Sequence, residues 1–104
     1  MDVAIRYQID VPVRVPDGTE FPAELLRDTL GELWDEFGIV ETTSVYRAAP
    51  GEPDPNRHDE WIRFWFDAPA IVATHQWITE WWRSTLAPRY PGFSLLVLWY
   101  HPSE

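Results

Sequence analysis

Residues 61–66 read Trp-Ile-Arg-Phe-Trp-Phe, and this hexapeptide decides the fold. Side chains of an extended strand alternate between two faces. One face of this segment is an ordinary core face, formed by Ile62, Phe64 and Phe66. The other is a flat aromatic surface with one cation, formed by Trp61, Arg63 and Trp65. Because such a surface needs cover from another element, another chain or a ligand, we expect the protein to make its contacts there.

Sequence patterns on both sides of the hexapeptide predict three further strands. Residues 3–11 alternate between apolar and polar side chains, which is typical of a half-covered strand. Residues 39–48 are rich in Thr, Val and Tyr and predict a second strand. The hexapeptide itself belongs to a third strand over residues 60–66, and residues 93–100 predict a last strand that is apolar on both faces.

Two helices are expected between these strands. The first runs over residues 22–37, with Pro22 in its opening turn and Gly38 as a left-handed stop. Its apolar stripe consists of Leu26, Leu30, Leu33, Trp34 and Phe37. The second helix follows Asp67, which is expected to cap it, has Pro69 in its first turn and ends before Pro88.

The apolar arc of the second helix, at 100° per residue, is predicted to contain Ile71, His75, Ile78, Trp82 and Thr85, with Trp81 and Leu86 on its flanks. His75 is therefore expected in the core or at its boundary. Trp77 lies off this arc and should be at least partly exposed, which makes it a second candidate for contact with a partner.

The order strand, helix, strand, strand, helix, strand predicts one α+β domain over residues 1–104. This split β-α-β (βαββαβ) order resembles the ferredoxin-like fold. With right-handed crossovers it predicts a four-stranded antiparallel sheet in the order 4-1-3-2, with two helices on one face and the other face open. The fold hosts many activities and therefore names none.

Composition limits the classes of function. The chain has 104 residues, of which 45% are hydrophobic and 15% aromatic, so it is not a disordered chain. A net charge of -9 argues against nucleic acid and anionic membranes as partners, because the chain would repel phosphate groups. No stretch approaches the length of a membrane span, so we expect a cytoplasmic protein.

No motif for catalysis or for a cofactor stands out. The chain has no cysteine, and its five glycines are dispersed rather than gathered in a phosphate-binding loop. His58, Asp59 and Glu60 are potential metal ligands, but consecutive strand residues point to opposite faces. We therefore expect neither a metal site nor a cofactor.

The leading hypothesis is a small acidic protein-binding module, more probably not an enzyme, that pairs with itself as a homodimer or docks as an accessory or inhibitory subunit on a larger protein. The predicted contact residues are Arg6, Gln8, Trp61, Arg63, Trp65, Trp77 and Trp99, with Tyr100 as the alternative to Trp99 and Tyr46 as an extension of the surface. Large aromatic side chains and arginine dominate the energetics of protein interfaces. A different arrangement stays open, in which a long loop of the chain, such as the proline-rich one between Tyr46 and His58, folds back and covers the tryptophans.

The alternative hypothesis is a cofactor-independent small-molecule enzyme of the dimeric α+β type. Its pocket would lie between the sheet and the helices and would be lined by Tyr7, Trp61, His75 and Trp99. In such a pocket His75 is the candidate general base.

Overall fold

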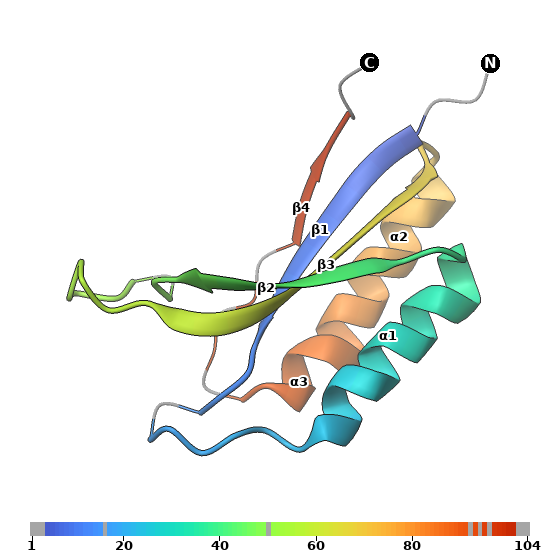
Figure 1. Ribbon diagram of the computed structural model, residues 1–104. Helices are drawn as coiled ribbons and strands as arrows, with labels where there is room; N and C mark the ends of the chain where they lie inside the picture. The colour runs from blue at the N-terminus through green and yellow to red at the C-terminus, as the bar shows by residue number, and fades with distance from the viewer. Residues whose placement is uncertain are drawn as a thin grey trace.

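The structure is a computed structural model of the chain, and it describes residues 4–15, 17–49, 51–91, 93, 95 and 97–101. Its strands are β1 (Ala4–Pro12), β2 (Glu41–Arg47), β3 (Asp59–Pro69) and β4 (Val97–Tyr100). Its long helices are α1 (Ala23–Phe37) and α2 (Val72–Trp81). A π-helical turn, η1 (Trp82–Leu86), joins α2 to the short α3 (Ala87–Arg89). Figure 1 shows these elements along the chain.

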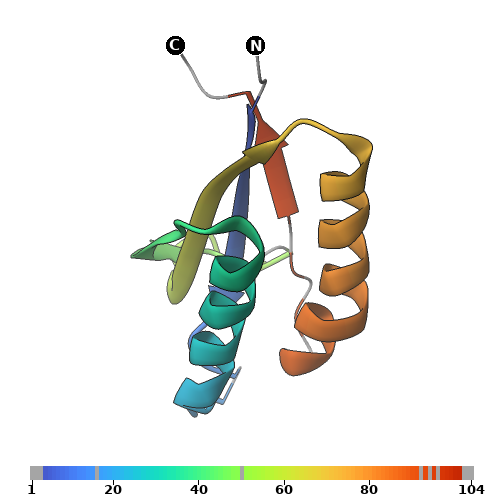
Figure 2. The ribbon, with the colours of Figure 1, turned by 90° about the vertical axis from the view of Figure 1, so that its right-hand side faces the viewer.

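The four strands form one antiparallel sheet in the order β2-β3-β1-β4. The central strands β1 and β3 pair along the whole of β1, from Ala4 opposite Pro69 to Pro12 opposite Trp61. β2 and β4 are the edge strands, and α1 and α2 run alongside each other next to the sheet (Figures 1 and 2). The predicted α+β class, with a four-stranded antiparallel sheet and two helices, is confirmed.

The core lies between the helices and one face of the central strands. The strand residues on this face that are at most 2% exposed are Tyr7, Ile9, Val11, Phe64 and Phe66. From α1, Phe37 stacks on Phe66 with 4.6 Å between ring centroids. From α2, the buried Ile78 lines a cleft together with Tyr7. Both long helices therefore cover the same face of the sheet.

β3 is longer than predicted, and this changes the start of the second helix. Ala68 is only 3% exposed, so it continues the buried alternation beyond Phe66. The expectation that Asp67 caps the helix is wrong, because Asp67 lies within β3 opposite Arg6 of β1. Pro69 ends β3 rather than sitting in a helical turn, and α2 begins only after Ile71.

The second helical segment buries a different stripe from the predicted one. Its buried residues are Thr74, Ile78, Trp81 and Leu86. His75 is exposed and Trp82 is only partly buried, so the prediction of a core or boundary histidine is wrong. A π-helical turn holds i to i+5 hydrogen bonds. Leu86 therefore returns to the buried side five residues after Trp81, which uniform α-helical spacing does not predict.

Polar side chains tie α1 to α2 and α3. Glu32 of α1 accepts a hydrogen bond from the indole Nε1 of Trp81, at 2.7 Å, and another from the guanidinium of Arg89. Arg89 also donates to the hydroxyl of the buried Thr29, at 3.1 Å. Burial alone would raise the pKa of Glu32, but the hydrogen bonds from Arg89 and Trp81 outweigh it and hold that pKa below 4.5.

The last strand is shorter than predicted and covers only Val97–Tyr100 of residues 93–100. Within the first part of that range, Phe93 packs edge-on against the ring of Phe21 and Leu95 is buried. Residues 94 and 96 lie outside the described part of the chain. The expected stop after the first helix is confirmed, because Gly38 has φ 84° and its N–H donates to the carbonyl of Trp34.

Candidate functional site

The face of the sheet turned away from α1 and α2 is called the open face below. Arg6 and Gln8 lie on it, opposite Asp67 and Trp65 of β3. On the other edge of β1, Arg6 is opposite Tyr100 of β4 and Gln8 is opposite Leu98. Because residues paired across an antiparallel ladder share a face, these six residues form two adjacent rows across the strands.

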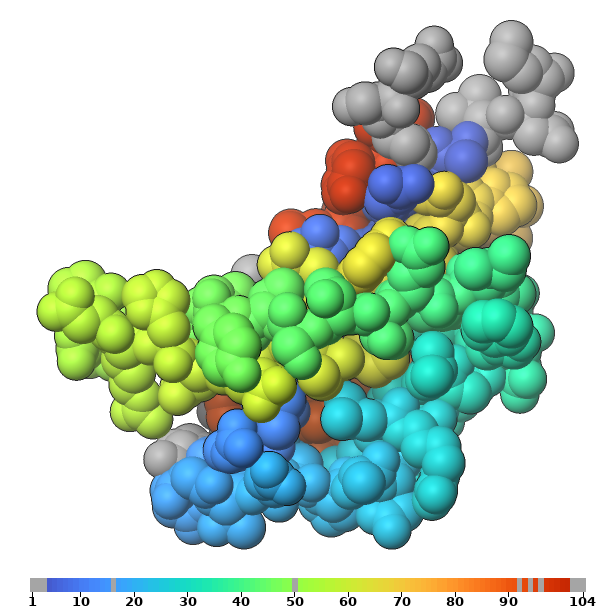
Figure 3. All heavy atoms as spheres, in the orientation of Figure 1, coloured from blue at the N-terminus to red at the C-terminus, as the bar shows by residue number. Residues whose placement is uncertain are grey.

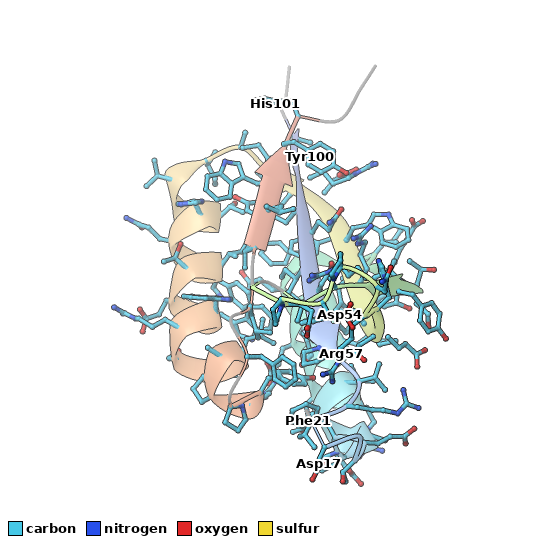
Figure 4. The ribbon with its side chains drawn as sticks, turned by 90° about the vertical axis from the view of Figure 1, so that its left-hand side faces the viewer. Asp17, Phe21, Asp54, Arg57, Tyr100 and His101 are labelled. Atoms are coloured by element: carbon cyan, nitrogen blue, oxygen red, sulfur yellow. The ribbon has the colours of Figure 1, made fainter. Side chains whose placement is uncertain are left out.

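The apolar part of these rows is accessible. Leu98 is 50% exposed and Tyr100 is 44% exposed, although both belong to the sheet. Trp65 is half-buried and lies one strand further in, on the far side of Gln8. Figure 4 labels Tyr100 at the end of β4, next to His101. Leu98, Tyr100 and Trp65 are called the open-face patch.

An exposed ion pair borders this patch. The Nε of Arg6 donates to Asp67 Oδ1 at 2.8 Å, and the same guanidinium donates to Oδ2 at 3.1 Å. The hydrogen bonds from Arg6 hold the pKa of Asp67 below its usual range. Both side chains are partly in solvent, so the pair fixes geometry at this end of the sheet more than it adds stability.

A second charge cluster lies deeper on the open face and is centred on Asp10. This carboxylate is 6% exposed and accepts two hydrogen bonds from Arg63, at 2.9 and 3.1 Å. It accepts a third, at 3.0 Å, from the Nε of Arg47 on β2. The hydrogen bonds to Asp10 raise the pKa of Arg63. One buried carboxylate thus holds two guanidinium groups over the centre of the sheet.

Trp61 lies on the open face but is only 1% exposed, so the expectation that it presents its indole to a partner is wrong. The guanidinium carbon of Arg47 lies 4.1 Å from the centroid of its ring. Phe93 meets the same ring edge-on, with 5.8 Å between centroids.

Arg47 lies in the segment between Tyr46 and His58 that was considered as a cover, but it belongs to the end of β2 and not to a loop that folds back. The proline-rich loop between β2 and β3 projects away from the body of the molecule instead (Figures 1 and 3). The indole Nε1 of Trp61 is buried without a hydrogen-bond partner among the residues that the structure describes.

Trp99 and Trp77 do not belong to the open face. Trp99 is opposite Tyr7 and shares the helix-covered face, where its ring meets His75 with 5.0 Å between centroids. Trp77 is half-buried between two other aromatic rings, Phe37 at 5.2 Å and Trp81 at 5.6 Å. The expected partial exposure of Trp77 is confirmed, but its position is that of a packing residue.

The structure therefore brings Arg6, Gln8, Arg63 and Trp65 together on the open face and removes Trp61, Trp77 and Trp99 from its accessible surface. Two residues with a central role there were not predicted, Asp10 and Arg47. The alternation of β1 contains the signal for Asp10, since it follows Arg6 and Gln8 at a spacing of two.

A cleft of about 260 Å³ lies on the other side of the sheet, between the second helical segment and β4. It is lined by Tyr7, His75, Ile78, Thr79, Trp82, Leu95, Val97 and Trp99. Three of the four residues predicted for an enzyme pocket meet in it, namely Tyr7, His75 and Trp99. Trp61, the fourth, is absent from the lining.

Among residues 4–15, 17–49, 51–91, 93, 95 and 97–101, no three His, Asp or Glu side chains are grouped so that they could hold a metal ion. Within those ranges, no helix combines the length and apolar character needed to cross a bilayer. Comparison of the chain with protein-family models, curated proteins and solved structures finds no match.

Proposed function

We propose that the chain has the ferredoxin-like arrangement and that it works as a protein-binding module through its open face. The strand order supports the first part, because β2-β3-β1-β4 read from the β4 edge is 4-1-3-2. The α+β class itself leaves the function open, since this arrangement serves unrelated activities. The second part depends on the surface chemistry of the open face.

The observation that carries the binding proposal is the open-face patch. Leu98 and Tyr100 keep about half of their surface in solvent, next to Trp65 and Arg6, on a face that no helix covers. Aromatic side chains and arginine are enriched at protein interfaces, where they supply much of the binding energy. Arg6, Gln8, Arg63 and Trp65 remain contact residues, and Leu98 and Tyr100 replace Trp61 and Trp99 as apolar anchors.

The partner we propose is a second copy of the chain, placed with its open face against the first. A symmetric contact of this kind uses the same patch twice. The charge distribution permits it, because the open face carries three arginines and four carboxylates, one net negative charge out of -9. These residues are Arg6, Arg47, Arg63, Asp10, Glu41, Asp59 and Asp67. Counted over the described residues, the face on which two copies would meet is therefore close to neutral in an acidic molecule.

The test is the mass of the protein in solution, measured by light scattering over a range of concentrations. We expect twice the mass of one chain for the wild type and one chain for Tyr100→Glu, because a second carboxylate would be desolvated in the contact beside Arg6, which Asp67 already neutralises. Tyr46→Glu is the matched control. Tyr46 is also an exposed tyrosine on an edge strand, but it is opposite Glu60 and lies on the other face.

A wild type that has the mass of one chain at every concentration would contradict the homodimer. Docking on a larger protein, as an accessory or inhibitory subunit, is then tested by the loss of a co-purifying protein in Tyr100→Glu and its retention in Tyr46→Glu. A cytoplasmic location belongs to the same proposal and is checked by cell fractionation.

A further inference from the structure

The cleft between the second helical segment and β4 is large enough for a small molecule. An apolar cavity of about 150 Å³ is known to hold one benzene ring. The volume of about 260 Å³ therefore accommodates a planar molecule of one or two fused rings. The cleft lies on the opposite side of the sheet from the open face, so a ligand there and a partner on the open face would not compete. Figure 4 shows α2 and β4 next to each other.

The wall of the cleft is mainly apolar and aromatic. Ile78, Leu95 and Val97 supply aliphatic surface, while Trp82 and Trp99 supply indole rings. No lysine, arginine, aspartate or glutamate is among its described lining residues. A flat, uncharged ring system matches this wall, because aromatic rings pack favourably edge-on or offset against indoles.

Tyr7 gives the cleft a polar group. Its side chain is 1% exposed and lines the cleft. Burial raises its pKa, so the phenol keeps its proton and remains a donor. A phenol in a mainly apolar wall is a directional donor, and a ligand oxygen can accept its hydrogen bond.

The backbone next to the cleft is also unusual. Trp82, one of the lining residues, begins the π-helical turn η1. Single π-helical turns in α-helices occur frequently at functional sites, because the wider turn changes the direction of the side chains.

We propose that this cleft binds a flat aromatic molecule of one or two rings that carries a carbonyl oxygen. The oxygen accepts the hydrogen bond of Tyr7, and the rings pack against Trp82 and Trp99. His75, whose ring meets Trp99, lies at the solvent side of the site, where substituents on the ring would reach it. The ligand binds without any covalent step.

The test uses 2-acetylnaphthalene as the probe and 2-ethylnaphthalene as its hydrocarbon counterpart without the carbonyl. Both are titrated into the wild-type protein, and the amide resonances are followed by NMR. We expect shifts confined to α2, η1 and the β1–β4 pair. We also expect the ketone to bind about five- to tenfold more tightly than the hydrocarbon, the usual effect of one hydrogen bond.

Three variants separate the wall of the cleft from the phenol. Tyr7→Phe should lose the preference for the ketone and keep the affinity for the hydrocarbon. Thr79→Phe places a ring in the cleft from an exposed position and should weaken both probes at least tenfold. Tyr46→Phe removes an exposed phenol elsewhere and should change neither. Each variant is first checked for a native amide spectrum.

Two results would overturn binding in the cleft, and a third would overturn the carbonyl as the recognised group. The first is the absence of localised shifts with either probe up to its solubility limit. The second is binding that Thr79→Phe leaves unchanged, since the probes would then occupy another surface. Equal affinity for the two probes in the wild type would remove the role given to Tyr7 and with it the carbonyl as the recognised group.

Discussion

The guanidinium of Arg47 lies 4.1 Å from the ring centroid of Trp61, and its Nε donates to Asp10 at 3.0 Å. One side chain therefore covers the most deeply buried tryptophan of the sheet and also neutralises part of a buried carboxylate. A lysine cannot do both, because its ammonium is a point charge without a planar face to lie on an indole. The order of the open face thus depends on this arginine.

Replacement of Arg47 by lysine should lower the free energy of unfolding by about 1–2 kcal/mol, because the stacking on Trp61 and the fixed hydrogen bond to Asp10 are lost. Urea denaturation followed by circular dichroism measures the change. Arg14→Lys is the control, since Arg14 makes only exposed ion pairs with Glu20 and Glu60. For Arg14→Lys we expect the free energy of unfolding to fall by less than about 0.5 kcal/mol. Similar losses in both variants would contradict the special role of Arg47.

Asp10→Asn should be more damaging, because it leaves Arg47 and Arg63 without their shared anion. The carboxylate is 6% exposed while its partners are partly in solvent, so we expect a loss of about 2–3 kcal/mol rather than the full cost of breaking a buried pair. The same denaturation experiment on Asp67→Asn serves as the comparison. Its pair with Arg6 is exposed, and the loss should stay below about 1 kcal/mol. Equal losses of unfolding free energy in Asp10→Asn and Asp67→Asn would show that the burial of Asp10 adds nothing to stability.

Acid should weaken the link between α1 and the second helical segment. Despite burial, the hydrogen bonds from Arg89 and Trp81 hold the pKa of Glu32 below its ordinary 4.5. A carboxylate whose pKa is lower in the folded state stabilises the protein above pH 4.5, and this contribution disappears as the pH falls through the folded pKa. Thermal unfolding of wild type and Glu32→Gln should therefore differ at pH 6 and converge below pH 4.5. A constant difference down to pH 3 would refute this assignment.

Two glycines of the first helical segment should respond to alanine with opposite signs. Gly38 ends α1 at φ 84°, where a Cβ is strained although no atom lies within 4 Å of it. Gly38→Ala should therefore cost about 1–2 kcal/mol. Gly31 lies inside α1 with equally open space, so Gly31→Ala should stabilise the protein by about 0.5–1 kcal/mol. The melting temperatures of the two variants measure this, and a shift of the same sign would contradict it.

Strand alternation was sufficient to predict which residues share a face. Arg6, Gln8, Arg63 and Trp65 lie together because a period of two is a property of the extended backbone itself. Alternation alone did not decide whether Trp99 or Tyr100 lies on the open face. Only the pairing of β4 with β1 places Tyr100 there. Register depends on partners distant in the sequence, so local patterns do not contain it.

Which side chains are buried was harder to predict than which residues share a face of the sheet. Trp61 has the predicted parity, yet Arg47 and Phe93 cover it, and both come from other parts of the sequence. In the second helix the buried stripe was misplaced, because Ile71 precedes the helix and the turn η1 departs from 100° per residue. The cleft nevertheless gathers Tyr7, His75 and Trp99, since residues on one face of the sheet meet the helix that covers it.

The two edges of the sheet have opposite characters. β2 presents Glu41, Thr42, Thr43 and Ser44, all exposed and polar, whereas β4 is a short apolar strand. Charged and polar side chains discourage a neighbouring chain from adding a strand, and a short strand offers few backbone groups to one. Both edges of the sheet therefore discourage growth into fibres by the addition of strands.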